Sequence, residues 1–313
     1  MVENFTADID STFAFVVGAC VILLVGIIVT MIYFLFRYHH TRNKQATDIE
    51  GNLVLEITWT LIPFLLAMTM FYFGMTGYQK MENVPENAMK VETTGRMWSW
   101  SFKYENGIET DTLYVPVGQP VLLNLSSKDV IHSFYIPAFK IKKDAVPGVP
   151  TRMWFRADEE GKYDVFCAEY CGQRHSYMLT KVVAMPREKY DAWSAGLAAN
   201  AVVEEESGGG ERNEAKDAER GKALVRTKGC VACHSTDGSR LIGPSYKGLF
   251  GKTATVITDG KERDVLVDAA YIDKSIHDPN ADKVKGFENM MMPPQTLSER
   301  EVEQIIAYLK TLK

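Results

Sequence analysis

The sequence predicts a membrane-anchored multidomain chain, in which a two-helix transmembrane hairpin precedes a β-rich domain and a mostly helical domain. Two long apolar runs stand near the N-terminus, and short β-rich segments separated by Gly and Pro follow them. A polar acidic stretch then leads into a region of helical periodicity. The net charge of −5 over 313 residues gives no sign of the basic face that a nucleic-acid partner requires.

The two apolar runs are the strongest local signal. Thr12 to Phe36 contains no charged residue, and Leu53 to Tyr78 contains only Glu56. Each run is long enough to cross a hydrocarbon core of about 30 Å as a helix. We therefore predict a transmembrane hairpin over residues 1–80, with helices at about 12–38 and 52–78. The alternative is a pair of buried core helices in a soluble protein.

The loop between the two runs indicates their orientation. It carries the basic or imidazole side chains Arg37, His39, His40, Arg42 and Lys44. By the positive-inside rule this loop is cytoplasmic, so both termini lie outside. The first eleven residues are acidic and lack a basic region, so a cleaved signal peptide is not expected. The two histidines are interpreted as interfacial.

Residues 81–193 are predicted to form a β-domain. Short β-rich segments at 91–94, 97–104, 112–117, 121–125 and 180–184 are separated by turn signals such as Gly118-Gln119-Pro120. This spacing suits a β-sandwich or a Greek-key barrel. Residues 194–216 are predicted to be a flexible acidic linker. Residues 217–313 are predicted to be mostly helical, and Ser298 with Glu301 forms a capping box before the last helix.

The first chemical cluster lies between Cys167 and Met178. Within twelve residues it holds two cysteines, His175 and a methionine. Thiolate, imidazole and thioether together suit copper, and two thiolates on one tight loop can each bridge two metal ions. Each copper then needs a terminal imidazole, which His175 and the distant His132 supply. A structural zinc site would leave Met178 unexplained, and a redox-active or disulfide pair would leave both histidines unexplained.

The second cluster is Cys230-Val-Ala-Cys233-His234. C-x-x-C-H is the attachment signature of c-type haem, although zinc and thioredoxin-like sites share its C-x-x-C. A second axial ligand is expected from a Met about 60 residues downstream, where Met290, Met291 and Met292 are the candidates. His277 is the other possible ligand, although a surface position suits it better.

Residues 10–190 resemble subunit II of the haem–copper oxidases. The resemblance rests on Glu56-x-x-Trp59-Thr60-x-x-Pro63, on Trp98 to Tyr104, on Asp129-Val-Ile-His132-Ser, on Lys143-Asp144-Ala-Val-Pro147-Gly148 and on the cysteine loop. It implies a cupredoxin-like Greek-key β-barrel with a binuclear CuA site. The implied ligands are His132, Cys167, Cys171, His175, Met178 and the backbone carbonyl of Glu169.

The same resemblance implies three further roles. The Glu169 carboxylate would help to bind a magnesium ion shared with subunit I, and oxygen ligands suit that cation. Trp98 matches the position where electrons pass from cytochrome c to CuA, and a buried sheet aromatic is compatible with that role. Glu56 matches the mouth of a proton path into subunit I, whereas interfacial snorkelling is its alternative interpretation.

Residues 217–313 resemble an all-α class I cytochrome c domain. The match includes Gly221 in the first helix, Gly243-Pro244, a Met-Pro-Pro motif and a closing helix with Tyr308. It implies covalent haem c on Cys230 and Cys233, with His234 and Met292 as axial ligands. Over nearly its full length the chain thus resembles the caa3-type subunit II, which fuses cytochrome c to the CuA domain.

The resemblance implies subunit II of a terminal cytochrome c oxidase in a bacterial inner membrane, with the CuA and cytochrome c domains on the periplasmic face. Electrons would come from a cytochrome c or a quinol-oxidising complex and pass through haem c and CuA to subunit I, where oxygen reduction and proton pumping occur. Subunit III is a further implied partner. The rival classes are a tethered electron carrier or copper-delivery protein, a nitrous-oxide reductase-like CuA protein and a quinol oxidase subunit.

Overall fold

The computed structural model describes residues 6–45, 50–206, 213–293, 295 and 297–313 of the chain. Residues 1–86 form one compact unit and residues 87–313 form the other. Pro294, the last residue of the Met-Pro-Pro motif, and residues 207–212 of the predicted linker lie outside the described residues.

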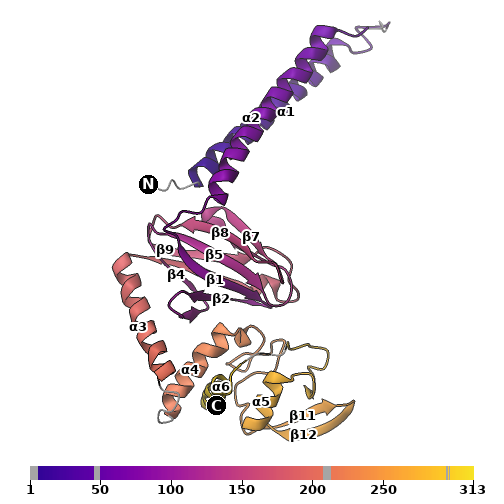
Figure 1. Cartoon of the computed structure of the whole chain (residues 1–313). Helices are drawn as coiled ribbons and strands as arrows, with labels where there is room; N and C mark the ends of the chain where they lie inside the picture. Colours follow the sequence, from indigo (N-terminus) through magenta and orange to yellow (C-terminus); the bar gives the residue numbers. More distant parts are fainter. Residues whose placement is uncertain (1–5, 46–49, 207–212, 294, 296) are drawn as a thin grey trace. The chain divides into compact units, whose positions relative to one another are not determined.

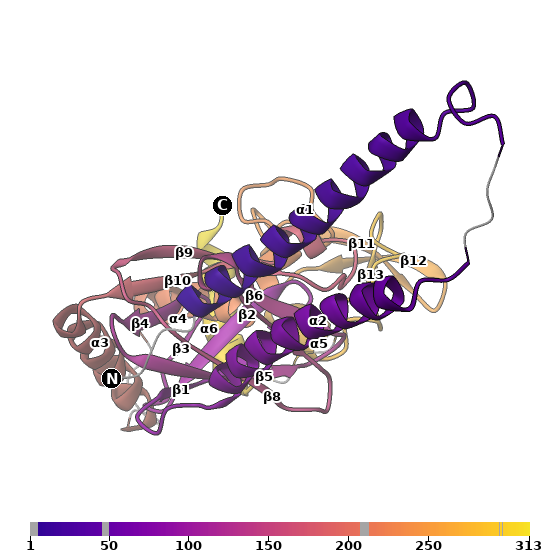
Figure 2. The same ribbon diagram turned by 90° about the horizontal axis from the view of Figure 1, so that it is seen from above.

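The first unit consists of two long helices, α1 (Thr6–Arg37) and α2 (Leu53–Glu82) (Figure 1). They come together near the start of α1 and the end of α2, where the rings of Phe15 and Phe73 meet at 5.5 Å. Toward the loop that connects them the two helices diverge (Figure 2). Both are long and apolar enough to span a membrane, and their most apolar windows bury nothing within the protein. These helices expose the apolar side chains that a soluble core helix would bury. Each helix also extends about four to six residues beyond one predicted end, because polar residues continue the helical backbone outside the apolar run.

Two five-stranded sheets form the β-domain. Their strand orders are β3-β2-β1-β5-β8 and β4-β10-β9-β6-β7, with parallel pairing only for β1 with β5 and β4 with β10. The first sheet contains β1 (Met89–Arg96), β2 (Ser99–Tyr104), β3 (Glu109–Thr110), β5 (Pro120–Ser127) and β8 (Thr151–Arg156). The second contains β4 (Leu113–Pro116), β6 (His132–Ile136), β7 (Ile141–Ala145), β9 (Gly161–Cys167) and β10 (Leu179–Met185).

Aromatic side chains join the two sheets in one core. The ring of Phe134 from β6 meets Trp100 of β2 at 4.9 Å and Phe102 of β2 at 5.9 Å. All three side chains are almost fully buried. The predicted cupredoxin-like sandwich is therefore confirmed. Its core reaches the start of β6, where the Trp100 ring lies 5.9 Å from the ring of His132.

Helix α3 (Arg187–Glu206) differs from the linker expected over residues 194–216. Its first half packs on the β-domain, where the Trp193 ring lies 4.6 Å from that of Tyr114. The helix then continues to Glu206 through Ala, Leu and Glu residues, which are strong helix formers. The polar composition indicated little burial, but it did not exclude local helix.

The C-terminal domain contains α4 (Glu214–Thr227), α5 (Ala269–His277) and α6 (Glu299–Thr311). The predicted capping box on α6 is present, and one face of α6 supplies the buried side chains of Val302, Ile305, Ile306 and Leu309. A small antiparallel sheet was not predicted. It comprises β11 (Thr253–Thr258), β12 (Lys261–Leu266) and β13 (Lys283–Val284), and its tight turn at Asp259-Gly260 was the available sequence signal.

Candidate functional site

Strand pairing brings the distant His132 to the cysteine loop. His132 begins β6 and Cys167 ends β9, and these antiparallel strands pair with Phe134 opposite Cys167. The His132 Nδ1 atom lies 3.9 Å from Cys167 Sγ. The loop after β9 then turns back, and Cys167 N–H donates to the carbonyl of Met178 at 3.2 Å. All the predicted copper donors thus come from one end of the second sheet.

The donor atoms surround a pair of thiols. Cys167 Sγ and Cys171 Sγ are 3.7 Å apart, and Cys171 Sγ lies 3.5 Å from His175 Nδ1 and 3.8 Å from Met178 Sδ. Cys167 Sγ lies 3.2 Å from the Glu169 carbonyl oxygen. Each thiol therefore has one imidazole and one further donor beside it.

These residues fit a soft metal better than a disulfide. Both cysteines are free, and a sulfur separation of 3.7 Å is far longer than a disulfide bond. His132, Met178 and both cysteines are buried, and His175 is half-buried, so most of the donors are shielded from water. A set of two thiols, two imidazoles and a thioether is the chemistry that copper prefers, whereas zinc sites are built from thiolate, imidazole and carboxylate.

The two thiols differ in their ease of ionisation. Burial raises the pKa of Cys167, but the hydrogen bonds with His132, with the Ser133 and Glu169 backbone and with Cys171 together outweigh burial and lower the pKa to about 6. At Cys171, burial and the adjacent Cys167 charge both raise the pKa. One thiolate therefore forms readily, and the second requires the positive charge of a metal, so metal binding releases protons.

Trp98 is attached directly to this site. Its indole Nε1–H donates to the carbonyl oxygen of Cys171 at 3.0 Å. Gly172 follows with φ +111°, and a Cβ there would lie 3.3 Å from the Trp98 ring. The indole thus rests against the loop backbone where only glycine leaves it room.

The structure places the two predicted glutamates outside this cluster. The Glu169 side chain is exposed, and only its backbone carbonyl faces Cys167. Glu56 is exposed in the first turn of α2, near the helix end that the sequence predicts to be cytoplasmic.

The second site begins where α4 ends. Gly229 adopts φ +77° and leads into a short 3-10 turn, η3 (Cys230–Ala232). The carbonyl of Cys230 accepts hydrogen bonds from the N–H groups of Cys233 and His234, at 3.1 and 3.0 Å. This turn holds both thiols and the imidazole on one short segment.

The His234 imidazole is oriented by its surroundings. Its Nδ1–H donates to the Pro244 carbonyl at 2.7 Å, which leaves Nε2 available as a ligand atom. Its ring stacks on Tyr246 at 4.7 Å with an interplanar angle of 5°. A Cβ at Gly243 would lie 2.5 Å from His234 Cε1, so the ring is pressed against glycine backbone.

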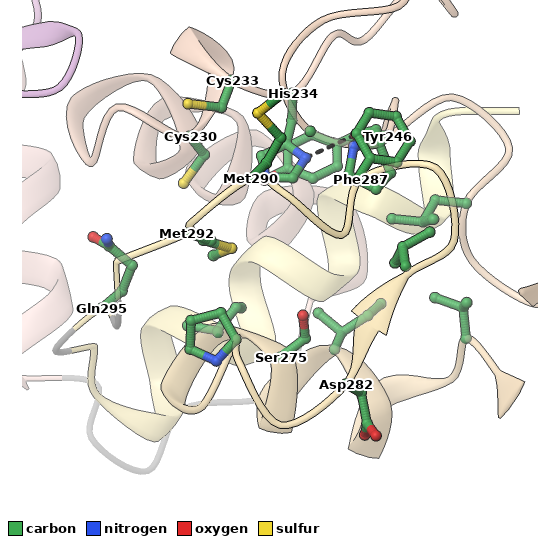
Figure 3. A pocket seen from close by; sticks show the side chains of 18 of the residues that line it. Cys230, Cys233, His234, Tyr246, Ser275, Asp282, Phe287, Met290, Met292 and Gln295 are labelled. Atoms are coloured by element: carbon green, nitrogen blue, oxygen red, sulfur yellow. Dashed lines mark hydrogen bonds between the residues drawn. The ribbon is translucent and has the colours of Figure 1, made fainter. Parts of the chain in front are cut away.

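An apolar cavity lies between this turn and the methionine segment. Cys230, Cys233 and His234 line it together with Met290, Met291 and Met292 (Figure 3). Most of its other lining is apolar, and the buried Tyr271 hydroxyl has no hydrogen-bond partner among the described residues. Burial also raises the pKa of the Cys233 thiol to about 11, unlike the acidic thiols of thioredoxin-like motifs. The two thiols, the imidazole and the apolar lining are the residues that a covalently attached haem would need.

The three methionines differ in exposure, and His277 lies elsewhere. Met291 is 84% exposed and Met290 38%, whereas Met292 is half-buried. His277 is exposed at the end of α5, where its Nε2 lies 3.3 Å from the Leu297 carbonyl.

The sequence analysis assigned no role to four residues that shape the sites: Asp129, Gly172, Tyr246 and Tyr271. Asp129 stands three residues before His132, a spacing that could have indicated a side-chain hydrogen bond to the imidazole. For the other three we find no local sequence signal.

Comparison with known proteins gives a consistent family. Three family models match: "Cytochrome C oxidase subunit II, transmembrane domain" over residues 5–76, "Cytochrome C oxidase subunit II, periplasmic domain" over 106–185 and "Cytochrome c" over 218–313. The cytochrome c oxidase subunit 2 of Alkalihalophilus pseudofirmus is 33% identical, over 95% of this chain and 86% of the relative. That of Bacillus subtilis is 28% identical, over 91% of this chain and 83% of the relative.

Among solved structures, the periplasmic domain of subunit II of the Bradyrhizobium japonicum cytochrome oxidase is 29% identical, with a TM-score of 0.35. It covers 36% of this chain and 94% of the solved chain. The family assignment rests on the relatives and the family models, which together extend from the apolar helices to the last residue. This chain belongs to the cytochrome c oxidase subunit II family, in the caa3-type form that carries a C-terminal cytochrome c domain.

Proposed function

We propose that this subunit accepts electrons at its own haem c and passes them through binuclear CuA to the oxygen-reducing haem–copper centre of subunit I, coupled there to proton pumping. The observation that carries the proposal is the buried group of two free thiols, each beside an imidazole. No residue of this chain is assigned to oxygen reduction.

For the copper centre, we assign His132, Cys167, Cys171, His175 and Met178 as side-chain ligands, with the Glu169 carbonyl as a backbone ligand. When bound, the copper pair supplies reversible one-electron transfer. The cysteine loop holds these ligand atoms in place, because the Met178 carbonyl accepts a hydrogen bond from the N–H of Cys167 at the end of β9. Both cysteines of the loop are buried. Rigid donors limit the rearrangement that accompanies a change of charge.

For haem c, we assign thioether attachment to Cys230 and Cys233, and axial ligation to His234 and Met292. When bound, the haem supplies a second one-electron carrier. The Pro244 carbonyl fixes the imidazole with Nε2 free, and the apolar cavity excludes water. Met292 is favoured because it directly precedes Pro293 and because, of the three methionines that line this cavity, it is the one that is not exposed.

Trp98 is our candidate for the residue through which electrons reach CuA. Its indole N–H donates a hydrogen bond to the backbone carbonyl of Cys171, the same residue whose thiol we assign as a copper ligand. Electron transfer from outside the β-domain would then need no further intervening side chain.

The remaining roles concern the oxidase complex. We propose that Glu56 marks the mouth of a proton path into subunit I, and that the exposed Glu169 carboxylate helps to bind magnesium at the subunit I interface. Subunit III and an upstream cytochrome c or quinol-oxidising complex complete the partners. The subunit would span a bacterial inner membrane twice, with both termini and both cofactor domains on the periplasmic face.

The first test is metal content. The full-length protein, made with haem-maturation machinery and purified in detergent, is assayed for copper and iron per chain and by EPR. We expect two coppers that share one unpaired electron, together with one covalently bound haem. Cys171→Ser should remove the copper signal and keep the iron. Cys20→Ser, at the free exposed cysteine of α1, is the matched control and should change neither.

One copper per chain, or zinc, would contradict the CuA assignment. The protein would then be a tethered electron carrier or a copper-delivery protein, which needs only one metal ion. Absence of copper with haem retained would favour a subunit that draws no electrons through CuA, as in quinol oxidases.

A further inference from the structure

Asp129 occupies the loop between β5 and β6, three residues before the copper donor His132. Its carboxylate Oδ1 lies 2.8 Å from His132 Nε2. The Asp129 side chain is 15% exposed and that of His132 is fully buried. Because a carboxylate only accepts, the imidazole Nε2–H donates to Asp129, which leaves Nδ1, the atom that faces Cys167, as the nitrogen that can bind a metal.

The second carboxylate oxygen of Asp129 has a different partner. Oδ2 accepts the backbone N–H of Met97 at 2.7 Å, and Oδ1 also accepts the N–H of the adjacent Val130 at 2.7 Å. Met97 directly precedes Trp98, whose indole N–H donates to the Cys171 carbonyl. One carboxylate thus connects the imidazole of one copper-donor loop to the segment that contacts the other.

Resting on the proposed function, we propose that Asp129 is a positioning residue for the copper centre and its electron path. It selects Nδ1 of His132 as the ligand atom, and it holds the Met97 backbone so that Trp98 stays against the cysteine loop. Outer-sphere carboxylates of this kind fix the tautomer of a ligand histidine and strengthen it as a donor. The local hydrogen bond to Val130 alone would be a loop cap, but it explains neither of the other two contacts.

Two neutral replacements of Asp129 test its role as a positioning residue. Asn at position 129 keeps the side-chain size but loses the charge and one of the two acceptor oxygens. Asp129→Ala removes all three contacts. Asp158→Asn is the matched control, because Asp158 lies in the same β-domain and its carboxylate pairs with Arg156 at 2.6 Å.

The test uses the full-length protein in detergent, loaded with haem and copper. We expect Asp129→Asn to raise the copper reduction potential, to shift the EPR spectrum and to weaken copper binding about 10- to 100-fold. Electron transfer from haem c to copper should slow in the same variant. Asp158→Asn should leave all four quantities at the wild-type values.

A wild-type potential, spectrum and copper affinity in Asp129→Asn would overturn the inference. Lower thermal stability with an unchanged spectrum and potential would also overturn it, because it would show a loop cap only. If Asp129→Ala does not fold, Asp129→Asn decides. Failure of the wild type to bind two coppers would instead contradict the proposed function, so the two failures are distinguishable.

Discussion

Replacing Gly221 by alanine tests the closest helix contact in the cytochrome c domain. Gly221 is buried in α4, and a Cβ there would lie 1.9 Å from the Gln304 carbonyl oxygen of α6 and 2.9 Å from Tyr308 Cβ. The obstacle is backbone, which cannot rotate away. The two helices must therefore separate by roughly 1 Å, a distance that breaks their close packing.

The cost can be estimated from this contact. Overpacking against rigid neighbours costs about 3 kcal/mol, whereas the better helix propensity of alanine returns about 1 kcal/mol. We expect a net loss of about 2 kcal/mol in the free energy of unfolding. For a domain of this size the melting temperature should then fall by about 10 °C.

The assay is thermal unfolding of the full-length protein, followed through the haem absorbance and circular dichroism. Gly196→Ala is the matched control, since Gly196 also lies in a helix but a Cβ added there would meet no atom within 4 Å. That variant should lose no stability. A melting temperature for Gly221→Ala equal to that of the wild type would refute the close approach of α4 and α6.

Three further predictions concern the β-domain and the cytochrome c domain. Trp98→Phe removes the hydrogen bond to the Cys171 carbonyl, so we expect full copper content but slower reduction of copper in stopped-flow measurements; an unchanged rate would argue against Trp98 as the point of electron transfer. Asp282 is 5% exposed and paired with two cations, which hold its pKa well below the usual range despite burial. Its contribution to stability should be complete above about pH 5 and lost as the pH falls through 4 towards the folded-state pKa. Asp282→Asn should lose about 2 kcal/mol at pH 7 and show a weaker acid dependence in urea unfolding; wild-type stability at pH 7 would contradict this. Ser298→Ala removes the capping box of α6 and should lower the free energy of unfolding by about 1 kcal/mol in the same assay. An unchanged free energy of unfolding would show that water replaces the cap without loss.

Local features were predictable because their cause lies within a few neighbouring residues. The apolar runs form α1 and α2 since a helix satisfies its own backbone hydrogen bonds, whatever surrounds it. Ser298 and Glu301 are close in sequence, so the cap of α6 could be foreseen. The C-x-x-C-H turn is equally local, and the structure places its two thiols and imidazole on one short segment.

Some features that depend on distant residues were not predicted. The sheet of β11, β12 and β13 was missed because its short strands are stabilised by pairing, and β13 joins from seventeen residues beyond the end of β12. Residues 194–206 were expected to be linker, but they continue α3, because a polar composition that indicates little burial does not exclude a helix.

The sequence by itself determined the chemistry of this protein: which thiols, imidazoles and thioethers are present, and that two apolar helices precede them. Only the tertiary structure decided which of these groups meet. His132 reaches Cys167 through the pairing of β6 with β9, and Asp129 reaches Met97 across 32 residues of chain. Local spacing encodes turns and helices, whereas contacts between distant segments depend on the register of the whole sheet.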